Sequence, residues 1–272
     1  MASGFSVGLV CASLLTVVAA LPAAAQQPPQ PPAQQPARER APEGWRFSVG
    51  AGALITPEYE GSKDSKVQAL PVLSARYRNV FFASFQDGIG LNLSDDDRFR
   101  YGPIVRYRFG RDEKDHRALR GTGDRDGTPE VGAYFRWRFA GPFEVGVEAR
   151  QGVGTGHGGF QVDLDLSASH RFGPVRLSAG PKVSYSSEDL MRYDFGINAS
   201  QASRSGYARY EPTGGLRSVG FGTNVGWQIT PSFTLAGFAS VSRLLSEAAD
   251  SPLVKAGNAT QVTGGLFVAY TF

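Results

Sequence analysis

Hydrophobic and polar residues alternate along most of the chain after residue 44. In FQVDLDLSASHRF, residues 160–172, every second residue from Phe160 is apolar except His170, and the residues between them are polar or charged. A period of two places successive side chains on opposite faces of an extended strand. EVGAYFRWRF (130–139) and FEVGVEARQ (143–151) repeat the pattern, which predicts β-strands and no convincing helix.

The alternating runs are about ten residues long and are separated by Gly, Pro, Asn or Asp, which is typical of an antiparallel all-β chain. The short connections all lie at one end of the strands, and the long connections at the other end, only if residues 79–94 form two short strands. We therefore expect about twelve strands, with ten as the alternative if 79–94 is one long bent strand. The expected strands lie near residues 45–55, 66–77, 79–86, 87–94, 98–109, 129–139, 143–152, 159–172, 174–185, 215–229, 232–243 and 259–272.

Such strands can form a soluble sandwich, with the apolar face inside, or a membrane barrel, with the apolar face turned to lipid. Aromatic residues gather at the strand ends, and the chain finishes with the apolar strand GGLFVAYTF. These features favour an all-β, up-and-down transmembrane barrel in the outer membrane of a Gram-negative cell. In the last strand one face carries Leu266, Val268, Tyr270 and Phe272, which we interpret as lipid-facing and as a signal for the outer-membrane assembly machinery.

The N-terminus indicates export. An apolar run at residues 5–21 is followed by three alanines and a Pro/Gln-rich tract, which matches a cleaved signal peptide. We expect a signal peptide at 1–25, a periplasmic tether at 26–43 and the barrel at 44–272. The single cysteine, Cys11, lies in the expected signal peptide, so cysteine chemistry is not expected in the mature chain. The net charge of +3 is dispersed, which argues against nucleic acid as a partner.

The polar faces of three neighbouring strands carry many charges, and alternation directs these side chains into the lumen. Arginine and glutamate on adjacent strands can pair across a spacing of about 4.8 Å. One interpretation is a plug of interlocked charges, and the other is a positively lined, anion-preferring pore. The candidate lining residues are Arg98, Arg100, Arg106, Arg108, Arg136, Arg138, Glu144, Glu148 and Arg150.

Candidates for catalysis or metal binding are weak. His170 points to the opposite face from Ser167 and Ser169, so the base cannot activate either serine as a nucleophile. His157 lies in a Gly-rich loop that lacks the following helix of a phosphate-binding loop. The acidic clusters SDDDR (94–98) and GDRDG (123–127) lack the full ligand pattern of a calcium loop. We expect no enzyme activity, no cofactor and no metal site.

The loop at 186–214 is long and contains Tyr193, Phe195, Tyr207 and Tyr210. Long loops on a rigid scaffold often carry function. Two uses remain open at this point: the aromatic residues could fold into the barrel mouth as a cap, or they could contact a partner.

Several longer motifs resemble the MipA/OmpV family of outer-membrane proteins. They are GAGALITPEYEGSKDSKVQALPVL (50–73), FQDGIGLNL (85–93), YGPIVRYRFGRDE (101–113) and the tail from Ser240 to Phe272. The tail is the most specific, because Arg243-Leu244-Leu245 followed by ADSPLV (249–254) is close to a family signature. The resemblance covers residues from about 44 to the end.

The resemblance implies a β-barrel among outer-membrane lipid and lipopolysaccharide. It also implies a scaffold role that joins a lytic murein transglycosylase to a penicillin-binding protein in peptidoglycan synthesis and turnover. A narrow channel or small-solute-binding barrel is the alternative function. The family's known members supply no catalytic residues to carry over to this chain.

Overall fold

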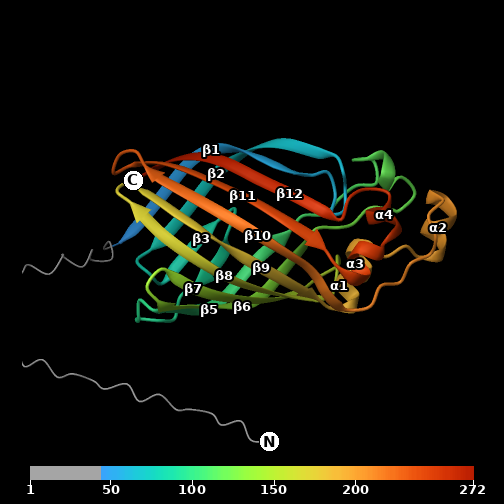
Figure 1. Ribbon diagram of the computed structural model, residues 1–272, viewed down its shortest axis with the longest axis horizontal. Helices are drawn as coiled ribbons and strands as arrows, with labels where there is room; N and C mark the ends of the chain where they lie inside the picture. Colours follow the sequence, from blue (N-terminus) through green and yellow to red (C-terminus); the bar gives the residue numbers. More distant parts are fainter. Residues whose placement is uncertain (1–43) are drawn as a thin grey trace, which may run out of the picture. The chain divides into compact units, whose positions relative to one another are not determined.

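The computed structural model describes residues 44–272, which form a closed barrel of twelve antiparallel strands (Figure 1). The expected signal peptide and tether, residues 1–43, lie outside the described residues. Each strand pairs with its neighbours in sequence, and β1 pairs with β12 to close the barrel. The strands are β1 (Trp45–Pro57), β2 (Ser65–Tyr77), β3 (Phe81–Ser84), β4 (Gly88–Leu91), β5 (Phe99–Arg108), β6 (Thr128–Ala140), β7 (Phe143–Gly152), β8 (Phe160–Phe172), β9 (Val175–Ser186), β10 (Gly215–Gln228), β11 (Phe233–Leu244) and β12 (Thr260–Thr271).

The predicted all-β barrel of about twelve strands is confirmed, and the ten-strand alternative is wrong. The short pair at 79–94 is indeed split, because Phe85, Gln86 and Asp87 form a turn between β3 and β4. An even number of strands lets every connection be a hairpin, so the start of β1 and the end of β12 lie at the same end of the barrel.

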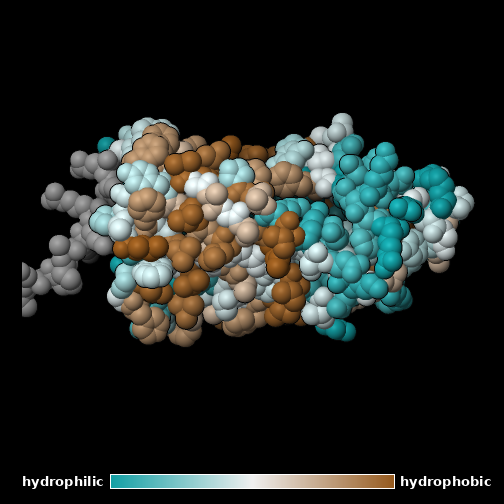
Figure 2. Space-filling model, turned by 90° about the horizontal axis from the view of Figure 1, so that it is seen from above, coloured by the Kyte–Doolittle hydropathy of each residue, from teal (hydrophilic) through white to brown (hydrophobic). Residues whose placement is uncertain are grey.

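The outward faces of the strands are apolar and exposed. In β12, Leu266 is 56% exposed and Val268 is 44% exposed, whereas Phe267 between them is only 9% exposed. Figure 2 shows the resulting apolar belt around the strands and a hydrophilic region over the helical end. This distribution is that of a barrel solvated by lipid around its middle and by water at its ends.

Aromatic side chains gather at the barrel end with the short turns. The rings of Phe47 and Phe272 are 6.1 Å apart, and Trp45 stacks on Phe47 at 5.6 Å. Phe233 and Tyr270 meet edge to face at 5.0 Å. Trp and Tyr rings favour the membrane–water boundary because they combine an apolar ring with a group that can be hydrated, so the girdle around Trp45 and Tyr270 marks one membrane surface.

The long connections meet at the opposite end and contain short helices (Figure 1). The prediction that residues after 44 contain no helix is wrong there, because these segments are too short to display a helical period. Within residues 44–272, no helix is both long enough and apolar enough to cross a membrane. The helices are η1 (Arg117–Leu119), α1 (Glu188–Phe195), α2 (Ala199–Ser205), α3 (Ser246–Asp250) and α4 (Pro252–Lys255).

These loops pack into a small hydrophobic core of their own, which we call the cap. One cluster joins α1 and α3 to the end of β11 through residues that include Met191 and Phe195. A second cluster contains Leu119, Ile197 and Leu253, each fully buried, from three different loops. Burying such side chains stabilises the loops by roughly 1.5–3 kcal/mol each, so the cap is a folded layer.

Candidate functional site

A ladder of ion pairs covers the inner face of strands β5 to β8. Arg100 contacts Glu144 at 2.9 Å, and Arg106 contacts Glu148 at 2.7 Å, each across the intervening strand β6. Alternation along each strand directs these groups inward, and the strand spacing brings opposite charges together. Fixed pairs of this kind stiffen the wall and leave few free charges along it.

Of the other expected lining residues, some join the ion-pair ladder and one does not. Arg136 lies 3.6 Å from Glu144 and 3.4 Å from Asp165, while Arg138 is 3.6 Å from Glu144. Arg98 differs from the expectation, because it precedes β5 and pairs with Asp96 at 2.8 Å in an exposed turn. The turn residue Asp96 accepts the backbone N–H of Arg98 as well, and this local bonding keeps Arg98 out of the ladder.

The ladder ends in a dense charged cluster near the cap. Arg150 lies 2.8 Å from Glu130, 3.0 Å from Glu148 and 2.7 Å from Asp163. Arg108 contacts Glu130 at 2.6 Å. Glu130 and Asp163 were not among the expected lining residues. Both lie on the polar face of an alternating strand, and this position could have identified them as lumen-facing.

The histidine of the Gly-rich loop is buried. The side chain of His157 is 1% exposed, with Nε2 at 3.3 Å from Glu130, and its ring lies 5.1 Å from that of Tyr193. The Gly-rich sequence around His157 therefore gave no indication that its side chain is buried. The carboxylate and the aromatic ring that enclose it come from β6 and α1, which lie far away in the sequence.

The helix α1 lies across the mouth of the barrel, held by charges from opposite walls. Asp194 on α1 contacts Arg217 of β10 at 2.6 Å and Arg108 of β5 at 3.6 Å. In the strand order of the barrel, β10 and β5 are five positions apart out of twelve, and are therefore nearly opposite. Arg217 also pairs with Glu60 of the β1–β2 loop, so one buried arginine connects three parts of the rim.

The charge state of Asp194 follows from its neighbours. Burial alone would raise the pKa of this carboxyl group, but the charges of Arg217 and Arg108 outweigh burial and lower its pKa from the ordinary value of 3.8. Asp194 is therefore ionised at neutral pH. An ionised carboxylate between two guanidinium groups forms charge-assisted hydrogen bonds, which are stronger than neutral ones.

The aromatic residues of the 186–214 segment belong to this cap. Phe195 is fully buried and lies under Arg217, whose guanidinium carbon is 4.9 Å from the ring centroid. The hydroxyl group of Tyr210 donates to the backbone oxygen of Glu247 at 2.7 Å, which joins this loop to α3. Of the two uses left open by the sequence, the structure places these side chains in a cap.

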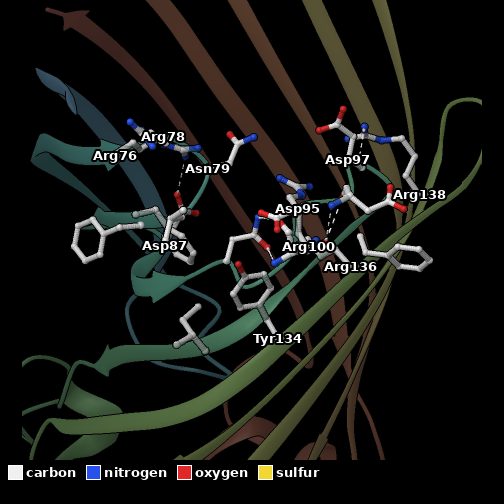
Figure 3. A pocket seen from close by; sticks show the side chains of 18 of the residues that line it. Arg76, Arg78, Asn79, Asp87, Asp95, Asp97, Arg100, Tyr134, Arg136 and Arg138 are labelled. Carbon is white, nitrogen blue, oxygen red and sulfur yellow. Dashed lines mark hydrogen bonds and ion pairs between the residues drawn. The ribbon is translucent and has the colours of Figure 1, made fainter. Parts of the chain in front are cut away.

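The opposite end of the lumen contains a wide cavity of about 610 Å³. Figure 3 shows Arg76, Arg78 and Asn79 on one side of it and Arg100, Arg136 and Arg138 on another. We call this cavity the vestibule. Arg76 lies 3.7 Å from Asp87, whereas Arg46 makes no ion pair with any residue in the range 44–272. The vestibule therefore offers charged groups that the ladder does not neutralise.

A second cavity of about 550 Å³ lies between the ladder and strands β9 to β11. Its far wall consists mainly of small or uncharged side chains, which contrast with Arg136, Glu144 and Asp165 on the ladder side. Lys182 is the charged residue of this far wall, which is otherwise weakly polar, whereas the ladder wall is densely charged. The far wall includes Ser178, Gly180, Ser218, Gly220, Gly222, Thr223, Asn224, Ser240 and Ser242.

The remaining candidate chemistry finds no assembled site among the described residues. His170 lies near the β8–β9 turn with its ring 4.3 Å from that of Phe172, while Ser169 faces the other side and lies 3.5 Å from the backbone oxygen of Pro142. Within residues 44–272, no group of three or more His, Cys, Asp or Glu side chains is arranged to hold a metal ion.

Comparison with known proteins places the chain in a family. The family model described as MltA-interacting protein MipA matches residues 49–272. The MltA-interacting protein of Escherichia coli (strain K12) is 24% identical over 216 residues, which cover 77% of this chain and 84% of that protein. YiaT of the same organism, provisionally described as an outer membrane protein, is 25% identical over 224 residues, which cover 80% of this chain and 89% of that protein.

Solved structures include similar barrels of low sequence identity. An outer membrane channel from Pseudomonas putida F1 is 13% identical, with a TM-score of 0.44, and the match covers 88% of this chain and 99% of that one. The NanC porin is 10% identical, with a TM-score of 0.43, and the match covers 82% of this chain and 98% of that one. The family match extends from β1 to the last residue, and we conclude that this chain belongs to the MipA family of outer-membrane β-barrel proteins.

Proposed function

We propose that this protein is a non-enzymatic scaffold of the outer membrane, with the vestibule end facing the periplasm and available to peptidoglycan enzymes. The observation that carries the proposal is the cap: α1 is held across the barrel mouth by Arg217 and Arg108 from opposite walls. A barrel closed in this way is poorly suited to continuous flow along its axis. The vestibule, with its charged lining, lies at the other end.

The orientation follows from the connections. Outer-membrane barrels have short turns on the periplasmic side and longer loops outside. The turns at 78–80, 141–142, 173–174 and 229–232 are short and lie at the vestibule end, whereas the segments 109–127, 187–214 and 245–259 form the cap. The vestibule and its arginines therefore face the compartment that contains peptidoglycan.

The partner class comes from the family. A relative carries the name MltA-interacting protein, and the scaffold proposal extends an interaction of that kind to this chain. Arg46 and Arg78 at the vestibule would attract an acidic surface of a murein transglycosylase or a penicillin-binding protein. Complementary charge mainly raises the association rate and selects the partner, and its effect weakens with salt.

Co-purification from membranes tests the proposal. The double variant Arg46→Glu/Arg78→Glu reverses two vestibule charges and should reduce recovery of a murein transglycosylase at least fivefold. Arg209→Glu is the matched control, because Arg209 is an exposed arginine in the β9–β10 segment that pairs with Glu211. Equal recovery with both variants, or no transglycosylase with the unaltered protein, would refute the vestibule as the docking site.

The alternative function is a narrow, anion-preferring channel or solute-binding barrel. The specific observation in its favour is the two internal cavities, of about 610 and 550 Å³, which share Arg136 and Glu144 in their walls. Planar-bilayer recordings separate the two functions. Steady, anion-selective current that disappears on charge reversal at Arg106 and Arg136 would favour the channel, whereas a silent barrel would favour the scaffold.

A further inference from the structure

The barrel wall is incomplete beside the β3–β4 hairpin. Strands β3 and β4 have four residues each, whereas β2 has 13 and β5 has 10. Pairing between β2 and β3 covers only Ser74 to Tyr77, and pairing between β4 and β5 covers only Ile89 and Gly90. On that side, residues 65–73 of β2 and the last three residues of β5 have no neighbouring strand.

This gap, which we call the window, has definite borders. The hairpin tip at 85–87 forms its lower edge, and the cap forms its upper edge, where His116 Nε2 lies 3.0 Å from a carboxylate oxygen of Asp64. Two strand positions are missing between β2 and β5. Three interstrand spacings of about 4.8 Å correspond to roughly 14 Å between the β2 and β5 backbones where no strand lies between them.

The window opens within the apolar belt. Val67 and Leu73 on β2 face outward and are 68% and 56% exposed. On the other side lie Phe85 and Phe109, which are exposed and have ring centroids 5.7 Å apart. Because the long loops face outside, the window lies in the outer half of the membrane.

The unpaired edge of β2 requires a polar neighbour. Backbone N–H and C=O groups facing hydrocarbon cost several kcal/mol each unless they are buried in protein or line a water-filled space. Pro71 lies in the middle of this edge and has no N–H to donate, and prolines within sheets occur mainly on edge strands. The remaining polar groups of the edge must be hydrated through the lumen.

The window leads to the vestibule. Asp87 at the hairpin tip and Arg106 of β5 both line the cavity of about 610 Å³, and Arg106 donates to the backbone oxygen of Gln86 at 2.9 Å. Figure 3 shows Asp87 on the same side of this cavity as Arg76 and Arg78. The window therefore joins an apolar rim to an arginine-rich interior.

The inner surface behind the window is also apolar. Alternation places Leu70 and Val72 of β2 on the inner face, and both are half-buried. Phe82 of β3 and Ile104 of β5 line the vestibule. An alkyl chain entering through the window would keep contact with apolar side chains on both faces of the wall.

We propose that the window admits the acyl chain of an anionic membrane lipid from the outer half of the membrane, with the polar head directed toward the arginines of the vestibule. Two observations favour this occupant. The rim and the adjoining inner face are apolar, and the cavity they lead to is lined by Arg46 and Arg78, which make no ion pair with any residue in the range 44–272. The cap lies across the barrel mouth, so the window is the lateral route into the lumen.

Quenching by brominated lipid tests whether acyl chains enter. The background protein has Trp45, Trp137 and Trp227 replaced by Phe, and Leu70→Trp is then the only tryptophan. Bromine on an acyl chain quenches a tryptophan that it contacts. Purified protein is reconstituted in vesicles of brominated phosphatidylglycerol, and folding is checked by heat-dependent mobility on gels.

Two matched variants give the high and low reference values for tryptophan quenching. Val67→Trp, on the outer face of β2, should be strongly quenched. Ser240→Trp is on the inner face of β11, which is paired on both sides, and should be quenched little. We expect quenching of Leu70→Trp to reach at least half that of Val67→Trp. Quenching no greater than that of Ser240→Trp would overturn the proposal.

The lipid head is tested by repeating the measurement in brominated phosphatidylcholine. The ratio of Leu70→Trp to Val67→Trp quenching should fall at least twofold in this lipid, because its head carries no net charge. An equal ratio in both lipids would overturn the assigned preference for an anionic head. Neither measurement depends on a transglycosylase, so the scaffold proposal stands or fails separately.

Discussion

The substitution Asp194→Asn should release the cap from the barrel wall. Asp194 contacts Arg217 at 2.6 Å and Arg108 at 3.6 Å. Removing one member of a buried ion pair typically costs roughly 3–5 kcal/mol, because the remaining charges stay buried without compensation. Both arginines retain a second carboxylate, Glu60 for Arg217 and Glu130 for Arg108, so we expect the lower end, about 3 kcal/mol.

Hydrogen exchange of the α1 amides measures this directly. A loss of about 3 kcal/mol corresponds to a roughly hundredfold increase in the opening equilibrium, so the amides of residues 190–195 should exchange roughly a hundredfold faster. Glu188→Gln is the control on the same helix. Its carboxylate pairs with Arg192 while both side chains are about half exposed, and such a pair contributes at most about 1 kcal/mol.

The same ion pairs predict a pH dependence. Because the pKa of Asp194 lies below 3.8 in the folded protein, its contribution to stability is complete well above pH 3.8. It is lost as the pH falls through the lowered pKa. Exchange of α1 should therefore accelerate relative to the rest of the protein below about pH 4, and Asp194→Asn should remove this acceleration. Equal α1 exchange in Asp194→Asn and Glu188→Gln at neutral pH would refute the role of Asp194.

Three further changes test other parts of the molecule. Leu253→Ala removes a fully buried side chain from the cap and should destabilise the cap by about 2–5 kcal/mol, seen as faster trypsin cleavage in the loops with an unchanged barrel. Asn198→Ala removes the bond that the backbone N–H of Gln201 donates to the Asn198 side chain in the α2 capping box and should cost about 1 kcal/mol, seen as faster exchange of α2 alone. Phe272→Asp replaces the exposed terminal aromatic, whose backbone pairs with Phe47, and should reduce the folded fraction in the outer membrane; normal assembly would contradict the role of Phe272 as an assembly signal.

The sequence alone determined the strands. A period of two is a local property, because neighbouring side chains of an extended chain point to opposite faces whatever they later contact. It therefore identified the alternating strands and the closing strand that ends at Phe272, and it placed Arg100 and Arg106 on the same face as Glu144 and Glu148. The count of about twelve, with ten as the alternative, rested on the placement of short and long connections. The residue spacing across a sheet then made cross-strand ion pairs a sound expectation.

Only the tertiary structure decided what the connections do. The α-helices of the cap have four to eight residues, too few for a helical period to appear, and most of their stability comes from packing against other loops. Asp194, Arg217 and Arg108 are far apart in the sequence and meet only because the barrel closes. The window has the same origin, since strand pairing across β2, β3, β4 and β5 depends on relative strand lengths and stagger. The alternation of apolar and polar residues depends on each segment alone, whereas barrel closure and cap packing depend on contacts between segments.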